Sequence, residues 1–403
     1  MSSACDVLIV GAGPAGATAA RTLALAGARV RMLDRARFPR NKPCGDYLNP
    51  GCAGVLNRIG ALGDIEHAAL PVPGWRIVAP DGAAASTAFS AGTGFALPRR
   101  TLDHVLLTRA ATMGAAVIEA ARVTALDRGP RGVRVTIERG AGPAEREVLS
   151  ARLVIGADGL RSAIARMIGV GALPRGGRFT VGAYLEGLEE TGASGERPPG
   201  EIHFAGDRFC GVASLPGGLA NVTIALSAGA LRTWRGDLDA GYWTALRAFP
   251  GLAGRLARAR TVGRLRASGP VGYRRRRAVS DGVLLAGDAA AVINPMTGQG
   301  MFLALRGGEL AGRAALRALD RGGPTRRALA AYDRERRWEF GDAFLLSRIL
   351  DYLAFRPSIV GRAVRAMADR PALGTRFIDA VGGVSRAAAV MHPGLLAALF
   401  GIA

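Results

Sequence analysis

The chain has 403 residues, 49% of them hydrophobic, and carries 53 Lys and Arg against 32 Asp and Glu, a formal net charge of +21. This length allows two or three packed units with a sizeable core. Four irregularly spaced cysteines exclude a disulfide scaffold or a zinc site of Cys–His type, so we expect no metal and a reducing, cytoplasmic setting. The basic balance does not indicate nucleic-acid binding, because Lys42 is the single lysine and the arginines are spread over the whole chain. No stretch is apolar enough to span a bilayer, which leaves a soluble protein or a peripheral membrane contact.

The first predicted element is a hydrophobic strand over residues 7–10, which runs into a glycine-rich turn. Gly11 permits the tight turn, Gly13 lets the backbone approach a pyrophosphate, and Gly16 lets the following helix lie close to the sheet. A second strand ends at Asp34, where a carboxylate is placed to accept hydrogen bonds from a ribose. Strand, turn, helix, strand and acid in this order predict a dinucleotide-binding site.

The remaining elements follow from hydrophobic periodicity and from Gly and Pro breaks. Residues 35–46 are predicted to form a loop that returns along the ligand, residues 140–143 a hairpin turn, and residues 274–277 a solvated loop before a strand. Helices are predicted over residues 17–26, 51–60, 99–113, 163–168 and 242–248, and through most of the chain beyond residue 300. Strands are predicted over residues 29–33, 115–120, 133–137, 148–155, 181–185, 202–204, 209–215, 221–226 and 283–286, with short strands between residues 71 and 97.

Buried parallel-type strands alternate with stretches typical of an antiparallel sheet that has one exposed face. This order predicts an α/β protein in which a Rossmann-like nucleotide-binding domain is interleaved with a β-sheet substrate domain, followed by C-terminal helices. The nucleotide-binding domain is assigned to residues 1–70, 99–170 and 280–340. The substrate domain is assigned to residues 71–98 and 171–279, and the C-terminal helical region to residues 341–403.

Two further motifs follow predicted strands: Gly156-Ala-Asp158-Gly159-x-x-Ser162, and Gly287-Asp288-Ala-Ala, which continues to Asn294-Pro-Met-Thr-Gly-Gln-Gly300. With the N-terminal turn, these motifs make the chain, over roughly residues 5 to 320, resemble the FAD-dependent oxidoreductases typified by p-hydroxybenzoate hydroxylase. That group, whose FAD domain is of the glutathione reductase-like type, also contains geranylgeranyl reductases and flavin halogenases. Pro43-Cys44-Gly45 and the segment from Asn294 to Gly300 are most similar to the geranylgeranyl reductases.

The resemblance implies FAD as cofactor, NAD(P)H as a reductant that docks transiently, and a set of cofactor contacts. Arg99 matches the family's arginine at the start of a helix, and Asp158 and Asp288 match its downstream aspartates; a helix opened by Gly298 and Gly300 would stabilise the anionic reduced ring. The implied FAD-binding residues are Gly11, Gly13, Pro14, Ala15, Gly16, Asp34, Arg35, Cys44, Gly45, Arg99, Val123, Asp158, Gly159, Gly287, Asp288, Pro295, Gly298 and Gly300.

Cys44 is the candidate catalytic residue, which would sit beside the flavin ring and help to position substrate or a proton; the alternative is a small buried residue with an inert thiol. The chain departs from the reductases at Asp46, where they usually continue Cys-Gly-Gly. The halogenase interpretation is weaker, because a W-x-W-x-I-P segment is absent and Lys42 does not match the halogenase lysine. His203 is interpreted as an ordinary strand histidine.

These features favour reduction of a C=C bond in a hydrophobic, isoprenoid or polyketide-like small molecule, with hydroxylation through a flavin C4a-hydroperoxide as the alternative. An electron-relay flavoprotein without a substrate pocket is a third hypothesis, and a nucleic-acid binder ranks last. The substrate pocket is predicted to be lined by Phe204, Phe209, Val212, Leu215, Val222 and Ile224. The amphipathic stretch beyond residue 343 is predicted to cover this pocket, to touch membrane lipid, or to pack on the core.

Overall fold

The computed structural model describes residues 5–130, 132–140, 145–170, 177–189, 200–234, 236–272 and 274–400. One layer is a largely parallel sheet with the strand order β18-β19-β11-β1-β2-β8. These strands are β18 Val279–Ser280, β19 Val283–Leu285, β11 Glu145–Gly156, β1 Cys5–Val10, β2 Val30–Leu33 and β8 Ala116–Ile118. β1 pairs in parallel with β2 and β11, and β11 with β19, so segments more than 270 residues apart meet in one sheet.

The long strand β11 changes partners along its length. Its first half pairs antiparallel with β10 (Gly132–Arg139), which pairs with β9 (Ala121–Gly129), and its second half enters the parallel sheet. The hairpin predicted after Gly140 is consistent with the antiparallel pairing of β10 and β11, but residues 141–144 themselves lie outside the described residues.

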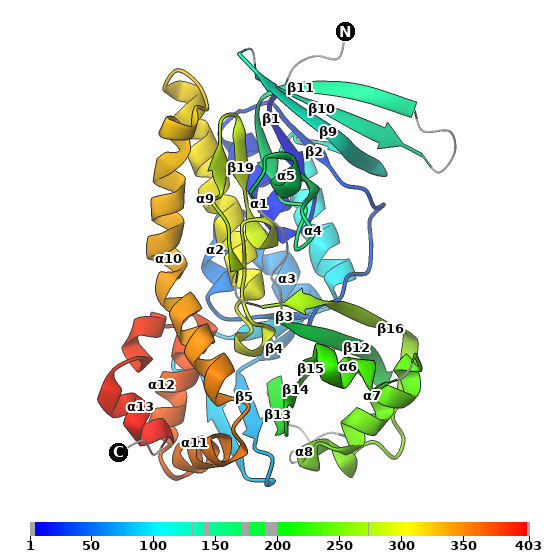
Figure 1. Ribbon diagram of the computed structural model, residues 1–403, viewed down its shortest axis with the longest axis vertical. Helices are drawn as coiled ribbons and strands as arrows, with labels where there is room; N and C mark the ends of the chain where they lie inside the picture. The colour runs from blue at the N-terminus through cyan, green and yellow to red at the C-terminus, as the bar shows by residue number, and fades with distance from the viewer. Residues whose placement is uncertain are drawn as a thin grey trace.

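Helices cover the parallel sheet, as Figure 1 shows. They are α1 Pro14–Leu25, α2 Cys52–Arg58, α3 Leu62–Ala68, α4 Arg99–Ala111, α5 Ala163–Met167 and α9 Gly300–Asp320. The helix predicted over residues 51–60 is shorter than expected, because Gly60 adopts a φ of +66° and the chain turns into α3, which the sequence pattern did not indicate.

The second layer is a seven-stranded sheet with the order β16-β12-β15-β14-β13-β5-β6. Its strands are β16 Arg260–Val271, β12 Arg178–Glu186, β15 Leu219–Ser227, β14 Arg208–Leu215, β13 Gly200–Ala205, β5 Gly74–Val78 and β6 Ala84–Ala88. All neighbours pair antiparallel except β13 and β5. One face packs on α7 (Leu238–Arg247), with α6 Ala228–Arg232 and α8 Pro250–Ala253 nearby.

Short elements connect the two layers. They are β3 Tyr47–Leu48, β4 Leu70–Val72, β7 Gly94–Ala96, β17 Arg274–Arg275, β20 Ala291–Val292, and the 3₁₀ turns η1 Gly287–Ala289 and η2 Pro295–Thr297. The solvated loop predicted at residues 274–277 is wrong for its first two residues, since Arg274 and Arg275 form β17 and pair with β20. Tertiary pairing with a distant strand overrides the local signal of four arginines.

The first of the C-terminal helices begins beside α9, and its last turns and the helices that follow lie beside the second sheet (Figure 1). They are α10 Arg326–Leu353, α11 Pro357–Asp369, α12 Pro371–Gly382 and α13 Pro393–Phe400, with the turn η3 Ala387–Val390. Their inner faces form a hydrophobic cluster with β5 and β6 that includes Trp75, Ile77 and Val364. Among the described residues, no helix is both long and apolar enough to cross a membrane.

Candidate active site

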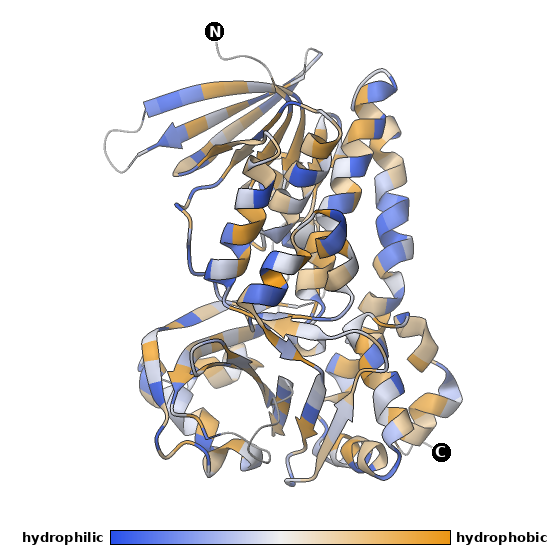
Figure 2. Cartoon of the chain, turned by 180° about the vertical axis from the view of Figure 1, so that it is seen from behind, coloured by the Kyte–Doolittle hydropathy of each residue, from blue (hydrophilic) through white to orange (hydrophobic). Residues whose placement is uncertain are grey.

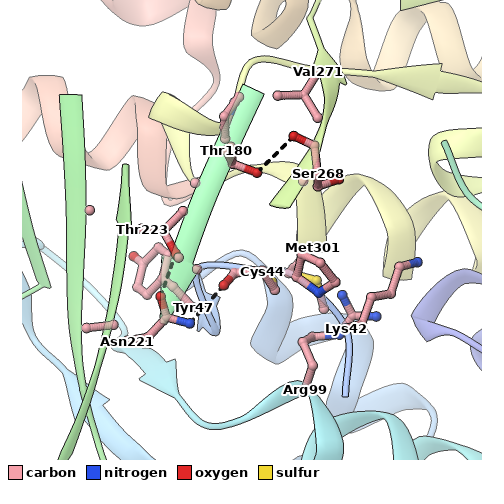
Figure 3. Close-up of a pocket in the computed structure, with 18 of the residues that line it drawn as sticks. Lys42, Cys44, Tyr47, Arg99, Thr180, Asn221, Thr223, Ser268, Val271 and Met301 are labelled. Atoms are coloured by element: carbon pink, nitrogen blue, oxygen red, sulfur yellow. Dashed lines mark hydrogen bonds between the residues drawn. The ribbon is translucent and has the colours of Figure 1, made fainter. Parts of the chain in front are cut away.

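A cavity of about 310 Å³ lies between the two layers. Gly13, Pro14 and Ala15 border it from the start of α1, residues 42–45 from the loop after β2, and Gly298, Gly300 and Met301 from the start of α9. The opposite wall is the antiparallel sheet, and Figure 3 shows Thr180, Asn221 and Thr223 there, facing Lys42, Arg99 and Met301. The cavity therefore joins the predicted cofactor-binding motifs to the predicted substrate sheet.

The glycine turn before α1 has the close approaches that the sequence predicted. Gly11 has a φ of +102°, and a Cβ there would lie 2.4 Å from the carbonyl oxygen of Ala157. A Cβ on Gly16 would lie 1.8 Å from the carbonyl oxygen of Gly11. α1 begins without a side-chain cap and without an acid in its first turn, so its N-terminal amides are available to an anion in the cavity.

A second helix start points to the same cavity. Gly298 has a φ of +62°, and a Cβ there would lie 3.1 Å from the Tyr47 ring. α9 then begins at Gly300, again without a side-chain cap or an acid in its first turn. Two uncapped helix N-termini on one cavity suit a ligand with a diphosphate and a ring that becomes anionic on reduction, so the residues fit FAD.

Asp34 directly follows the last residue of β2, and its side chain is hydrogen-bonded to the glycine turn. Its carboxylate accepts hydrogen bonds from the backbone N–H groups of Ala12 (2.8 Å) and Ala36 (2.9 Å), and Arg40 approaches to 4.0 Å. Asp34 does not line the cavity itself, so its hydrogen bond to a ribose stays a prediction.

Arg99 is buried at the start of α4 and lines the cavity. Its guanidinium makes a bidentate pair with Asp103, both contacts at 2.8 Å, and Arg40 reaches the same carboxylate at 2.9 Å. Burial opposes its charge, but the Asp103 carboxylate favours it and the pKa of Arg99 is raised. Arg99 is therefore a fixed positive charge at the cavity.

The two downstream aspartates lie in different positions. Asp158 accepts hydrogen bonds from the Ser162 hydroxyl (2.5 Å) and the Ala163 N–H (2.6 Å), so its carboxylate caps α5 and does not line the cavity. Asp288 does line the cavity. It also raises the pKa of Lys42, but burial and Arg99 have the larger effect, so the pKa of Lys42 is lowered overall.

Most of the other residues predicted to contact FAD line the cavity. They are Gly13, Pro14, Ala15, Cys44, Gly45, Gly159, Gly287, Pro295, Gly298 and Gly300. Arg35 is exposed directly after β2, and Val123 is buried within β9; neither borders the cavity.

Asn221 connects the Cys44 loop to the antiparallel sheet. Its Nδ2 donates to the carbonyl oxygen of Cys44 (2.8 Å) and to the carboxylate of Asp46 (2.7 Å), and its Oδ1 accepts from Thr223 (2.7 Å), as Figure 3 shows for the first and last of these bonds. Sequence reasoning missed both residues. The signal was strand alternation, because Asn221, Thr223 and Ala225 border the cavity while the intervening residues pack on the α7 side.

Asp46 is buried at the edge of the site with a φ of +54°, which is unusual for a residue other than glycine. Its carboxyl group also accepts a hydrogen bond from the Arg99 N–H (3.0 Å). Burial raises the pKa of Asp46, and the neighbouring Asn221 and Tyr184 side chains offset only part of this rise. Tyr184 itself lines the cavity.

Cys44 lies in the cavity wall, half-buried, with a free thiol. Burial raises the pKa of this thiol more than Arg99 lowers it, so Cys44 is a neutral thiol near pH 7. Such a group can contact a ligand or donate a weak hydrogen bond, but it is not an activated nucleophile.

A second, smaller cavity of about 80 Å³ adjoins the first. Trp75, Ile202 and Met296 border both cavities, and the remaining lining is almost entirely apolar and comes mainly from α10, α11 and α12. Of the six residues predicted to line a substrate pocket, Phe209 and Val212 border the first cavity and Phe204 the second. The other three, Leu215, Val222 and Ile224, border neither and belong to the core.

His203 is fully buried, and its Nε2 lies 2.8 Å from Glu201 Oε2. It borders neither cavity. Among the residues that the structure describes, no group of three His, Cys, Asp or Glu side chains could hold a metal ion.

Comparison with known proteins identifies the class. A family model described as an FAD binding domain matches residues 4–186 and 259–342. Digeranylgeranylglycerophospholipid reductase 1 of Methanothermobacter thermautotrophicus is 30% identical over 352 residues, covering 85% of this chain and 84% of the relative. Menaquinone reductase of Mycobacterium tuberculosis is 33% identical over 331 residues, covering 77% and 76%.

Among solved structures, a geranylgeranyl bacteriochlorophyll reductase-like protein from Thermoplasma acidophilum superposes with a TM-score of 0.81 at 23% identity, over 98% of both chains. The chain is an FAD-dependent oxidoreductase with the fold of the p-hydroxybenzoate hydroxylase group. Within that group it belongs to the geranylgeranyl reductase-like family.

Proposed function

We propose that this protein uses FAD, reduced by NAD(P)H, to reduce a carbon–carbon double bond in a hydrophobic small molecule that carries an isoprenoid segment. The observation that carries the proposal is the junction of the two cavities, since the first contains the two uncapped helix starts that we assign to FAD and the second is an adjoining apolar space. The names of the two relatives above, a digeranylgeranyl lipid reductase and a menaquinone reductase, support it.

Different residues of the cavity would bind different parts of the cofactor. The N-terminal amides of α1, beside Gly13, would hold the diphosphate, with Arg99 as a nearby positive charge. The N-terminus of α9, at Gly300, would face the flavin ring and stabilise negative charge there. FAD, when bound, supplies the hydride chemistry.

Reduction of a double bond also needs a proton at the second carbon. Tyr184 borders the cavity, and its side chain lies near enough to the Asp46 carboxyl group for each to shift the pKa of the other. Burial raises the pKa of Asp46, so this carboxyl group keeps its proton to a higher pH than an exposed aspartic acid does. Tyr184 gives its hydroxyl proton to the substrate and takes the Asp46 proton in return.

The apolar cavity binds the isoprenoid segment. Trp75 and Met296 lie where the two cavities adjoin, so a substrate that passes them has one end beside the flavin site and its tail among the side chains of the C-terminal helices. Burial of apolar surface contributes about 25 cal/mol per Å² to binding such a tail. Cys44, as a neutral thiol in the wall, contacts the reacting end.

A single-turnover experiment tests the proposal. The purified protein is reduced with NAD(P)H under anaerobic conditions and mixed with a digeranylgeranylglycerophospholipid, a menaquinone or an unprenylated aromatic compound. We expect NAD(P)H to bleach the flavin absorbance, and a prenylated substrate to gain two hydrogens without oxygen. A strict requirement for oxygen, with oxygen added to the product, would overturn the proposal in favour of hydroxylation. Bleaching without product from any substrate would favour an electron relay.

A further inference from the structure

The solvent face of α10 is unlike the rest of the surface. Six large hydrophobic residues are exposed in the described part of the chain, and three of them, Trp338, Leu345 and Tyr352, lie on this one helix with exposed fractions of 69%, 49% and 66%. Their spacing is seven residues in each step. Because two helical turns take about seven residues, the three side chains form a single stripe roughly 20 Å long.

Arginines flank the stripe. Arg334 and Arg337 are exposed within one turn of Trp338, and Arg348 is exposed within one turn of Leu345. In addition, the Arg386 guanidinium lies 4.8 Å from the Trp338 ring centroid and that of Arg356 lies 3.6 Å from the Tyr352 ring centroid. We call Arg334, Arg337, Trp338, Leu345, Arg348 and Tyr352 the α10 outer face.

α10 contains five acidic residues, and none of them is as exposed as Arg334, Arg337 and Arg348 of the same helix. Each of the five is engaged with a basic residue: Asp333 with Arg336, Glu335 with Arg317, Glu339 with Arg306, Asp342 with Arg386, and Asp351 with Arg178. The negative charges are thus paired, although the Glu335 and Asp351 side chains keep exposed fractions of 38% and 47%. The face combines exposed arginines with apolar and aromatic side chains.

Figure 1 shows α10 along one edge of the molecule. Figure 2 shows the same helix from behind, with strongly hydrophilic bands between hydrophobic ones. Such a surface with interleaved arginines matches the boundary between lipid headgroups and acyl chains, where Trp and Tyr rings lie and where basic residues meet anionic headgroups.

The inner side of the same helix leads to the substrate site. Leu350, Leu353 and Ala354, at its C-terminal end, border the apolar second cavity. We propose that the α10 outer face docks this protein on the surface of a membrane that contains anionic lipids. Docking there places the apolar cavity next to the phase from which a hydrophobic substrate comes.

Vesicle co-sedimentation of the full-length, FAD-loaded protein tests the proposal. The vesicles are phosphatidylcholine alone or a phosphatidylcholine–phosphatidylglycerol mixture, each at low and high salt. The wild-type protein is expected to bind the mixed vesicles and to lose most of this binding in high salt. Changing Arg334 and Arg337 together to Gln should weaken binding by at least about tenfold, and so should Trp338, Leu345 and Tyr352 together to Ser.

The chain offers matched controls for both variants. The other three exposed large hydrophobic residues, Leu25, Met113 and Val148, are changed together to Ser, and two exposed arginines elsewhere, Arg247 and Arg258, together to Gln. These controls should bind vesicles as the wild type does. Equal binding by the α10 variants and the controls, or no binding of the wild type to mixed vesicles, would overturn the proposal.

Two further measurements separate the alternatives. Trp338 is the one exposed tryptophan of the four, all of which are described, so its emission should shift to the blue on vesicle binding, and Trp338→Phe should abolish the shift. Sedimentation velocity without lipid tests self-association: a dimer that dissociates in the Trp338, Leu345 and Tyr352 variant would identify the stripe as an interface between copies and overturn membrane docking. None of these readouts depends on catalytic activity, so they are independent of the proposed reaction.

Discussion

Tyr184 borders the cavity from the sheet side and lies near Asp46. Its substitution should therefore affect proton supply to the substrate without affecting cofactor binding. We expect Tyr184→Phe to slow product formation in a single turnover by about 10²-fold or more, the usual contribution of a general acid. Reduction of FAD by NAD(P)H should keep its rate. Tyr47→Phe is the control, since Tyr47 borders the same cavity but its hydroxyl contacts Trp75 (3.0 Å). Loss of activity in both variants alike would argue against a specific proton path.

If Asp46 supplies the proton, the rate of substrate reduction should depend on pH in a predictable direction. Burial raises its pKa, so the protonated form that supplies the proton persists above the range of an ordinary aspartic acid and is lost as pH rises through the raised value. The rate of substrate reduction should therefore fall as pH rises, while FAD reduction over the same range does not follow that curve. Asp46→Asn should remove most of the rate and also this pH dependence. A substrate-reduction rate that rises with pH in the wild type would exclude Asp46 as the source.

The helices α9 and α1 pack tightly against each other next to the glycine turn. A Cβ on Gly308 would lie 2.2 Å from the carbonyl oxygen of Ala15, a residue that borders the cavity. Gly308→Ala must therefore push the two helices apart. We expect a loss of about 1–3 kcal/mol in the free energy of unfolding, as for other overpacked sites, and weaker FAD binding.

The control for this substitution is Gly341→Ala, in the middle of α10, where nothing lies within 4 Å of the added Cβ. Alanine is favoured over glycine inside a helix, so this variant should be neutral or more stable by up to about 1 kcal/mol and should bind FAD normally. Urea unfolding and FAD fluorescence titration measure both quantities. If both variants behaved alike, the helix contact would not position the turn.

For the whole molecule, the sequence predicts the parallel sheet and both helix starts well, because these depend on local patterns: hydrophobic strands, glycines at fixed spacing, and the absence of caps. It does not predict that Asp46 lies near Tyr184 or that Asn221 meets Cys44, since these pairs lie 138 and 177 residues apart and depend on how the two sheets face each other. Apolar residues such as Val222 were expected in the pocket. They face the core instead, because the cavity side of β15 is the polar one.

The residues proposed to bind the cofactor come from both halves of the chain, from Gly13 to Gly300, so FAD should stabilise the molecule as a whole. A ligand that binds only the folded state adds about 2.7 kcal/mol at a concentration 100 times its Kd, which for a chain of this size corresponds to a rise in Tm of roughly a few degrees. Thermal unfolding of the flavin-free protein should therefore show a Tm that increases steadily with FAD concentration. Riboflavin, which lacks the diphosphate that the start of α1 is expected to bind, should give a much smaller rise. An equal shift with riboflavin would mean that the α1 amides contribute little to binding, and no shift with FAD would contradict the assignment of this cavity to the cofactor.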